Sequence, residues 1–291
     1  MLKFSLCVLC VSAVNIKLSN TMSTVPPALK YSRITEKCFI NAPFDQLRDG
    51  DLLDLFITNR LQPEIGFEGN SLWELKVDDF KKIADIFRAN GLACTLHAPF
   101  FDLSPGGFDK RVVEITRDKL GRAFNLLQVF RPQSIVCHLG FEENKHRGKF
   151  DSWLATALET WRQLLEIADQ YNTRVMFENT YETSPEVHKI LFEQLDAPNL
   201  GFCMDTGHLT AFAHTSWQPW LAELSPWLGQ LHLHDNDGAG DNHLALGLGI
   251  FDFRELFNFL NKNHPPLLTL EPHSKEDLWQ SLSYIQRTGL F

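Results

Sequence analysis

The sequence has little positive charge, with 27 Lys and Arg against 36 Asp and Glu among its 291 residues and a formal net charge of -9. Proteins that bind DNA or RNA through the phosphates need clustered Lys and Arg, so the composition argues against a nucleic-acid partner. The N-terminal apolar run from Phe4 to Val14 is too short to cross a bilayer as a helix. We therefore expect no membrane partner and a cytoplasmic protein.

Cysteines are few as well, six in the whole chain. Cys94, Cys137 and Cys203 lie inside apolar, strand-like runs, where a free Cys behaves as a small hydrophobic residue. Cys7 and Cys10 form a C-x-x-C, but they belong to the N-terminal apolar tract and do not follow a strand of a redox fold. The sequence therefore predicts no disulfide framework.

Residues 1–30 are expected to be a leader outside the folded domain. Lys3 and the apolar run after it resemble a short, weak signal peptide, whereas Met22 opens MSTVPP, a suitable true start. We favour a disordered or mis-assigned leader over a functioning signal, and whether residues 1–21 belong to the mature chain stays open. Residues 31–291 are expected to form one domain, because no low-complexity tract or linker interrupts them.

From about Lys37 onward, apolar runs alternate with amphipathic stretches. The apolar runs predict eight strands, at 38–41, 63–67, 93–97, 134–138, 174–178, 200–205, 230–234 and 267–271. The stretches between and after them predict helices at 44–59, 77–90, 109–130, 152–171, 184–195, 217–224, 252–261 and 275–286. Eight strand-then-helix units are the count that closes an α/β (β/α)8 barrel. A doubly wound nucleotide-binding sheet would need G-x-G-x-x-G after its first strand, and that motif is absent there.

The third to eighth predicted strands all end in potential metal ligands, namely His97, His138, Glu178, Asp205, His232 with His234, and Glu271. In a barrel the carboxyl ends of the strands converge on the face that carries the active site. The next loop adds Asp241 and His243. Asp205 alone could merely cap the helix that follows, but six such ends in register favour a shared metal site. Imidazole and carboxylate ligands suit Zn, Mn, Co or Fe(II).

Six motifs carry a resemblance to a known family: HAPF (97–100), FEN (177–179), MDTGH (204–208), HLHDND (232–237), DNHLALGLG (241–249) and LEPH (270–273). With them the chain, from about Phe39 to its C-terminus, resembles the xylose isomerase-like TIM-barrel superfamily. That superfamily contains sugar-phosphate isomerases and epimerases, and also the bacterial endonuclease IV of abasic-site repair. As a set, the motifs are specific for the superfamily and much less so for the substrate.

The isomerase and epimerase branch of this family is the leading hypothesis. It implies one divalent ion with four ligands, Glu178, Asp205, His232 and Glu271. Glu178 and Glu271 would be the catalytic acid and base on opposite faces of a small sugar or sugar phosphate, with the ion as Lewis acid. His208 would hold a substrate hydroxyl. Enzymes of this branch often have an Arg shortly after the seventh-strand histidine, where this chain has DNDG at 235–238.

The endonuclease branch implies up to three ions. Their ligands would be, ion by ion, His97, His138 and Glu178; Glu178, Asp205, His232 and Glu271; and His208, Asp241 and His243. Such a cluster activates water and neutralises a phosphodiester, so the alternative function is a zinc phosphodiesterase or abasic-site endonuclease. Phe100 and Phe101 occupy positions where that family wedges side chains into a duplex, but packing over a small-molecule pocket is the simpler interpretation. A barrel that only binds a sugar is the third hypothesis.

Other polar residues have roles that the sequence leaves open. His234 shares a strand face with His232 and could bind metal or substrate, or orient a ligand. Asn179 is expected to fix the Glu178 carboxylate or contact substrate, and Glu64 could reach the pocket or face solvent. Four further histidines in helical or polar stretches are expected to be solvated: His146, His188, His214 and His264. The substrate's identity and the oligomeric state are open too.

Overall fold

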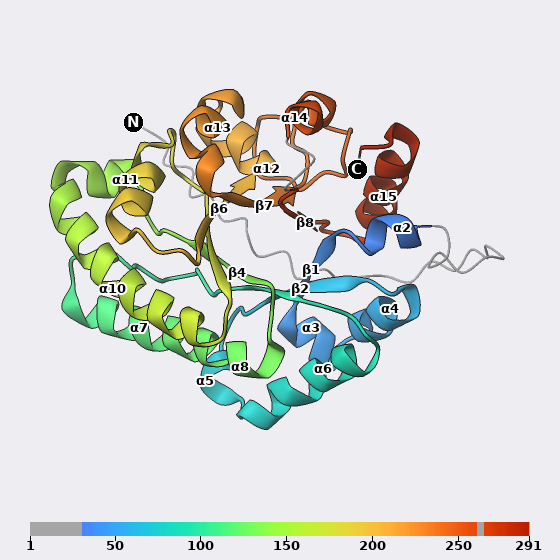
Figure 1. Cartoon of the computed structure of the whole chain (residues 1–291), viewed down its shortest axis with the longest axis horizontal. Helices are drawn as coiled ribbons and strands as arrows, with labels where there is room; N and C mark the ends of the chain where they lie inside the picture. The colour runs from blue at the N-terminus through green and yellow to red at the C-terminus, as the bar shows by residue number, and fades with distance from the viewer. Residues whose placement is uncertain (1–30, 261–264, 291) are drawn as a thin grey trace, which may run out of the picture.

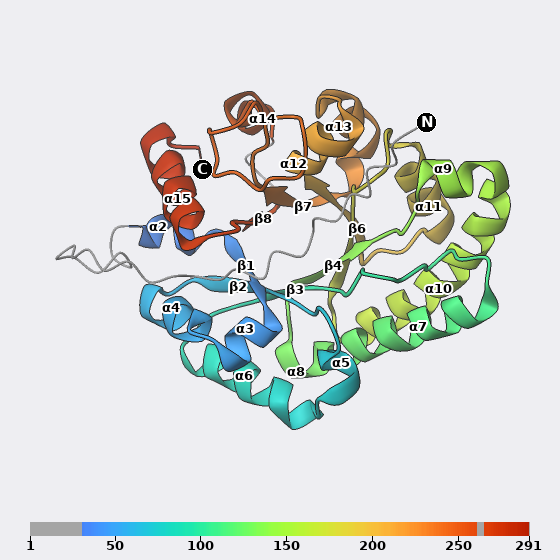
Figure 2. The same ribbon diagram turned by 180° about the vertical axis from the view of Figure 1, so that it is seen from behind.

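The computed structural model describes residues 31–260 and 265–290, so the expected leader (1–30) and His264 lie outside the described residues. Eight parallel strands form a closed barrel in which each strand pairs with the next in sequence. The ring closes where β8 (Leu267–Leu270) pairs with β1 (Phe39–Pro43). Helices surround the strands in chain order, as Figures 1 and 2 show from opposite sides. The predicted (β/α)8 barrel is therefore confirmed.

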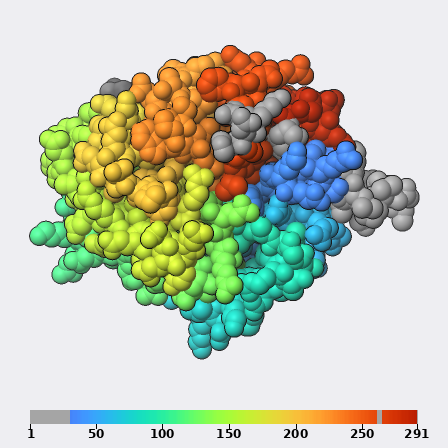
Figure 3. Space-filling view, in the orientation of Figure 1, coloured from blue at the N-terminus to red at the C-terminus, as the bar shows by residue number. Residues whose placement is uncertain are grey.

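The remaining strands follow the predicted apolar runs to within a few residues. They are β2 (Gln62–Gly66), β3 (Thr95–His97), β4 (Ser134–His138), β5 (Arg174–Glu178), β6 (Leu200–Asp205) and β7 (Leu228–Leu233). Strands of a parallel barrel are covered on both faces, and this is why their sequences are nearly continuous apolar runs. In Figure 3 the blue N-terminal segment lies beside the red C-terminal helix where the barrel closes.

Most helices match the predicted stretches, but several short helices were not predicted. The larger ones are α6 (Val77–Ala89), α7 (Lys110–Asn125), α10 (Phe150–Gln170), α11 (Glu186–Leu195), α13 (Gln218–Leu224), α14 (Phe253–Phe259) and α15 (Lys275–Thr288). The short ones are α2 (Ser32–Thr35), α5 (Ser71–Glu74), α9 (Glu143–His146), α12 (Thr206–His208) and the short helical segments η1 (Arg147–Lys149), η2 (Leu209–Ala213) and η3 (Ser225–Trp227). The predicted helix 109–130 is interrupted at Leu126, and its last part is α8 (Leu127–Phe130). Among the described helices, not one combines the length and apolar character that a membrane crossing requires.

The first predicted helix, 44–59, is wrong in one respect, because the structure has two helices there, α3 (Phe44–Asp49) and α4 (Leu52–Asn59). Gly50 adopts an extended backbone between them, and a Cβ at this position would lie 2.8 Å from the carbonyl oxygen of Gln46. The glycine is thus required by the close approach of the α3 backbone, and it ends that helix.

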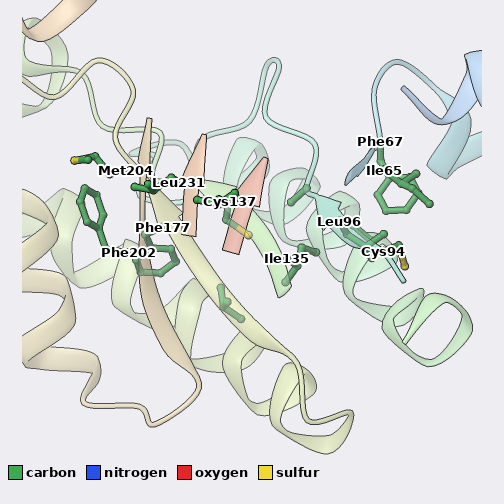
Figure 4. Close-up of a cluster of buried hydrophobic side chains, with 14 of the residues drawn as sticks. Ile65, Phe67, Cys94, Leu96, Ile135, Cys137, Phe177, Phe202, Met204 and Leu231 are labelled. Carbon is green, nitrogen blue, oxygen red and sulfur yellow. The ribbon is translucent and has the colours of Figure 1, made fainter. Parts of the chain in front are cut away.

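The hydrophobic core lies between the barrel and its helices. Alternate strand residues such as Phe177, Phe202 and Leu231 point outward into this layer, part of which Figure 4 shows. Burying each such side chain contributes about 1.5–3 kcal/mol. The residues between them point into the barrel, because successive side chains of a strand face opposite sides. This alternation directs the strand-end residues toward the barrel axis.

Candidate metal centre

The carboxyl ends of the strands bring four predicted ligands together at the barrel axis. The ligand atoms of this four-residue group (Glu178, Asp205, His232 and Glu271) all lie within 4.8 Å of one another. All four side chains are buried, Glu271 being the most exposed at 7%. The Nδ1 atom of His232 lies 3.1 Å from Glu178 Oε1 and 3.1 Å from Glu271 Oε1. One imidazole thus faces a set of carboxylate oxygens.

A second set, the histidine group, consists of His97 and His138 with Glu178. His97 Nε2 lies 3.1 Å and His138 Nε2 3.0 Å from Glu178 Oε2. The ring of Phe100 stacks on His138 with a centroid distance of 4.1 Å. Glu178 therefore has one oxygen in each group, which is the arrangement of a carboxylate that can bridge two ions.

A third set, the loop group, contains His208, His234, Asp241 and His243. Asp241 Oδ2 lies 3.5 Å from His208 Nε2 and 3.3 Å from His243 Nε2. His234 belongs to this set as well: its Nε2 lies 3.0 Å from Asp205 Oδ1, and its ring stacks on His243 at 3.7 Å. The nine residues implied by the resemblance are thus brought to adjoining places, with His234 as a tenth.

Backbone carbonyls orient three of the histidines. The Nδ1 atoms of His97, His208 and His243 lie 2.9, 2.9 and 3.0 Å from the carbonyl oxygens of Ala98, Asn179 and Glu271, respectively. If each Nδ1 carries the proton, Nε2 is left with a lone pair that faces the carboxylates. Such partners fix the tautomer and the ring orientation of metal-binding histidines.

The segment after β7 is organised by two residues whose role the sequence analysis missed. Asp235 accepts hydrogen bonds from the backbone N–H groups of Gly247, Gly249 and Phe251. Asn236 Oδ1 accepts from the N–H groups of Asn242 and His243. These bonds hold the loop that carries Asp241 and His243, and the motif HLHDND contained the signal, because Asp and Asn commonly bind nearby backbone.

Asp205 combines the two roles that its sequence left open. Its Oδ1 accepts a 2.6 Å hydrogen bond from the N–H of His208, the geometry of a helix N-cap, while it also belongs to the four-residue group. Asn179 pairs its amide with the backbone of Asp205, at 2.9 Å to the N–H and 3.1 Å to the carbonyl. Asn179 therefore positions Asp205, and it is buried at 1% exposure.

The charges of the groups depend on each other. Burial opposes ionisation of Glu178, but His232 and His138 hold the pKa of that carboxyl well below its usual range. Burial raises the pKa of Glu271, and the carboxylates of Asp205 and Glu178 raise it further against the effect of His232. For His208, burial favours the neutral ring, yet the carboxylates of Asp205, Asp241 and Glu178 raise its pKa well above the ordinary value. Cations are therefore favoured among these carboxylates.

The groups suit divalent ions on their donor chemistry and spacing. Donors bonded to one ion at roughly 2.0–2.2 Å lie at most about 4.4 Å apart, close to the 4.8 Å within which each group is held. Imidazole and carboxylate donors match Zn, Mn, Co or Fe(II). Three buried carboxylates in one group also need compensating positive charge. The residues therefore fit the metal that the resemblance implies.

A cavity of about 360 Å³ opens onto this face of the barrel. From the groups, its lining includes His97, His138, Glu178, His208, Asp241 and Glu271, and Phe100 and Asn41 line it too. Asp205, His232 and His234 are not among its lining residues. Its size suits a small molecule, since ligand pockets are typically about 300–1,000 Å³.

Two histidine predictions are wrong. His146 and His188 were expected in solvent but are 6% and 0% exposed. His188 Nε2 lies 3.1 Å from the carbonyl oxygen of Glu178, and the ring packs among Phe202 and Trp220. Leu191 and Phe192 lie three and four residues after His188 on α11, and this spacing could have indicated that His188 belongs to the buried face of the helix.

The sequence left open whether Glu64 reaches the pocket or faces solvent. In the structure Glu64 is fully buried in the barrel.

Comparison with other proteins agrees with this architecture. An uncharacterised protein of Methanocaldococcus jannaschii is 29% identical over 178 residues, which are 57% of this chain and 59% of the relative's own length. A D-tagatose 3-epimerase-like protein has a TM-score of 0.73 at 21% identity, covering 86% of this chain and 96% of that one. A Thermus thermophilus protein soaked with zinc chloride has a TM-score of 0.71 at 24% identity, covering 86% and 97%.

These structural likenesses establish the fold, and the family follows from a separate match. The family model described as xylose isomerase-like TIM barrel matches residues 63–287, from β2 through most of α15. The matched span contains all the ligand groups described above. The chain therefore belongs to the xylose isomerase-like TIM-barrel family.

Proposed function

We propose that this chain is a divalent-metal-dependent isomerase or epimerase of a small sugar or sugar phosphate. The observation that carries the proposal concerns the four-residue group. Its two glutamates, Glu178 and Glu271, line the cavity, whereas Asp205 and His232 do not. The carboxylates that isomerisation would use are thus the ones that a molecule in the cavity can touch.

Proton transfer next to a carbonyl would fall to these two glutamates. One carboxylate takes the proton from the sugar carbon and the other returns a proton, which positioned acids and bases accelerate by about 10²–10⁴-fold. A divalent ion (Zn, Mn, Co or Fe(II)) held by the four-residue group supplies the Lewis acid that polarises the carbonyl. His208, which lines the cavity, is placed to form a hydrogen bond with a substrate hydroxyl.

The charge of the cavity favours a neutral sugar over a sugar phosphate. Five carboxylates line it, from Asp45, Glu68, Glu178, Asp241 and Glu271. Lys275 is the one Lys or Arg among the described lining residues. A bound ion would offset its ligands Glu178 and Glu271, and the remaining carboxylates, Asp45, Glu68 and Asp241, would repel a phosphate. We therefore expect the free sugar to be turned over faster than its phosphate ester.

Solvent exchange tests the proposal directly. The protein loaded with Mn, Co or Zn is incubated with a panel of ketoses and aldoses in D2O, and deuterium at carbon is measured by NMR together with any new epimer. We expect exchange in wild type, its loss in E271Q, and its retention in E68Q, a control at another lining carboxylate. No exchange with any sugar and any of these metals overturns the proposal.

A second candidate function, a multinuclear zinc phosphodiesterase, is favoured by one specific observation. Glu178 directs one oxygen to the histidine group and the other to the four-residue group, and the loop group adjoins them. This is a suitable frame for several ions, which supply positive charge against a phosphodiester and lower the pKa of water. His97 and His138 have no necessary role in a one-ion isomerase other than substrate contact.

Metal content separates the two candidates. Elemental analysis after zinc loading and removal of excess metal gives about one ion per chain for the isomerase and three for the phosphodiesterase. Hydrolysis of bis(4-nitrophenyl) phosphate by the three-zinc form, without deuterium exchange into any sugar, establishes the second candidate. Failure of that form to nick a duplex with an abasic site removes the DNA version.

A further inference from the structure

A buried polar layer lies inside the barrel directly beneath part of the metal centre. Thr95, Gln230 and Thr269 precede His97, His232 and Glu271 by two residues on β3, β7 and β8, so they share the inward face with those ligands. Glu64 of β2 lies among them, and all these layer residues are 0% exposed. A buried carboxylate needs a full set of partners to be tolerated at all.

One oxygen of Glu64 is supplied with donors by the layer. Glu64 Oε2 accepts hydrogen bonds from Thr95 Oγ1 at 2.8 Å, Thr269 Oγ1 at 2.9 Å and Gln230 Nε2 at 2.6 Å. The amide of Gln230 is itself oriented, because the hydroxyl of Ser134 donates to its Oε1 at 2.6 Å. Gln230 must therefore present its NH2 group to Glu64.

The other oxygen of Glu64 faces a ligand of the metal centre. Glu64 Oε1 lies 2.8 Å from Nε2 of His232, and neither atom has a hydrogen bond of good geometry among the described residues. The Cys203 thiol also interacts with the His232 side chain. The contact between Glu64 and His232 is too bent for a hydrogen bond of good geometry, so it acts through charge and orientation. An ionised carboxylate only accepts, so the Nε2–H tautomer makes this contact attractive, whereas a lone pair on Nε2 would face the carboxylate oxygen. The lone pair of His232 is then on Nδ1, which faces the carboxylates of the four-residue group.

His232 is thus oriented in the opposite sense to three other histidines of the centre. His97, His208 and His243 direct Nδ1 to backbone carbonyls and Nε2 toward the site. His232 directs Nδ1 toward the site and Nε2 to a buried side chain. Among the described residues no backbone carbonyl accepts from Nε2 of His232, and the carboxylate that faces this nitrogen is that of Glu64.

We propose that Glu64 is a positioning residue of the metal centre, which holds His232 as the Nε2–H tautomer so that Nδ1 is free to bind the ion. The inference rests on the metal binding that both candidate functions share. It assigns a purpose to a carboxylate that never reaches the cavity, and it makes the layer beneath the ligands part of the site.

The variant E64Q tests the tautomer because it is nearly isosteric. The amide oxygen of the new side chain can keep the three donors Thr95, Thr269 and Gln230. The NH2 group of the same amide then faces His232 Nε2 and forces the ring proton onto Nδ1. The reverse orientation would place two NH2 groups, of Gln230 and residue 64, against each other. Losing such an outer partner typically weakens metal affinity by about 10–100-fold, which we expect for zinc measured by chelator competition.

The matched control is T95V, which removes one donor to the same carboxylate but leaves the contact with His232. We expect T95V to bind zinc as wild type does, and equal weakening in both variants overturns the proposal. Equal zinc affinity of E64Q and wild type, with both folded by circular dichroism, overturns it as well and leaves the proposed function intact. A wild-type chain that binds no zinc overturns both.

A second measurement needs no variant, so it decides the matter even if E64Q does not fold. Long-range 1H–15N spectra of the zinc-loaded wild-type protein report which ring nitrogen of His232 carries the proton. We expect a protonated Nε2 and a metal-bound Nδ1. A protonated Nδ1 with Nε2 on the ion overturns the inference.

Discussion

The two halves of the barrel interior beneath the ligands differ in chemistry. On β3, β7 and β8, the residues two before a ligand are polar: Thr95, Gln230 and Thr269. On β4, β5 and β6, the corresponding residues are Val136, Met176 and Cys203, which form a small apolar cluster of their own. We call these sets the polar half and the apolar half. Both are 0% exposed, so burial alone does not distinguish them.

The difference shows two ways of holding a ligand. In the polar half, His232 is contacted from below by Glu64, which the layer orients. In the apolar half, Glu178 rests above Met176, and its polar partners come from other directions: histidines at its own level and His188 from the helix side. We therefore expect loss of the Glu64 carboxylate, which the polar half orients, to alter metal affinity, and substitutions in the apolar half to alter stability.

The largest effect is expected at Glu178 itself, which belongs to two ligand groups and lines the cavity. E178Q should lower turnover by about 10²–10⁴-fold and weaken zinc binding more than E64Q does. The control is E182Q, since burial raises the pKa of Glu182 to about 7 and its carboxyl is largely neutral below that pH already. Steady-state kinetics and chelator competition measure both, and turnover near the wild-type rate in E178Q would remove Glu178 from the mechanism.

Met176 provides the sharpest test of the apolar half. M176A leaves a cavity beneath Glu178 and should lower the free energy of unfolding by about 2–5 kcal/mol. Zinc affinity of the folded variant should stay as in wild type, because Met176 gives no hydrogen bond to a ligand. M176L, which nearly conserves volume, should cost less than about 1.5 kcal/mol. The contrast between the two halves would be contradicted if the free energy of unfolding of M176A, measured in urea, stayed near the wild-type value while its zinc affinity fell as in E64Q.

The support of Glu178 by His188 predicts a dependence of stability on pH. Burial lowers the pKa of His188 from 6.5 to about 4. Between these values the unfolded chain binds a proton there that the folded chain does not, so lowering the pH through this window removes stability, about 3 kcal/mol in all. Below about pH 4 both states are protonated and this contribution stays constant.

The variant H188Q isolates that contribution. Its amide can still donate to the Glu178 carbonyl, but it does not titrate. Urea unfolding of the metal-free proteins should therefore give a shallower loss of stability between pH 6.5 and 4 in H188Q than in wild type. Parallel curves would show that His188 is not held in its neutral form.

The fold and the ligand positions were accessible from the sequence for a common reason. Buried parallel strands are nearly continuous apolar runs, so the polar residue that ends each run is conspicuous, as at Glu178 and Asp205. A closed ring of such strands then brings the ends together wherever they lie in the chain. The split between α3 and α4 was not accessible in the same way, because Gly50 is required by contact with the carbonyl of Gln46.

Glu64 could not be assigned from the sequence. Both faces of the strand Gln62–Gly66 are covered. An alternation of apolar and polar residues around Pro63 and Ile65 therefore does not tell whether Glu64 points into the barrel or away from it. Its partners come from three other strands, at positions 31, 166 and 205 residues away. The sequence contains each partner, but only the register of the barrel brings them to one carboxylate.

The smallest expected effect concerns a single donor in the polar half. T269V removes one of three hydrogen bonds to Glu64 Oε2, while Thr95 and Gln230 still donate to it. The free energy of unfolding should fall by about 1 kcal/mol, the usual net value of one hydrogen bond, and T269S should restore it. Zinc affinity should not change, because the contact between Glu64 and His232 remains. A loss in T269V as large as in M176A would mean that the layer stabilises the fold as a unit, and that the polar half contributes to stability as much as to metal binding.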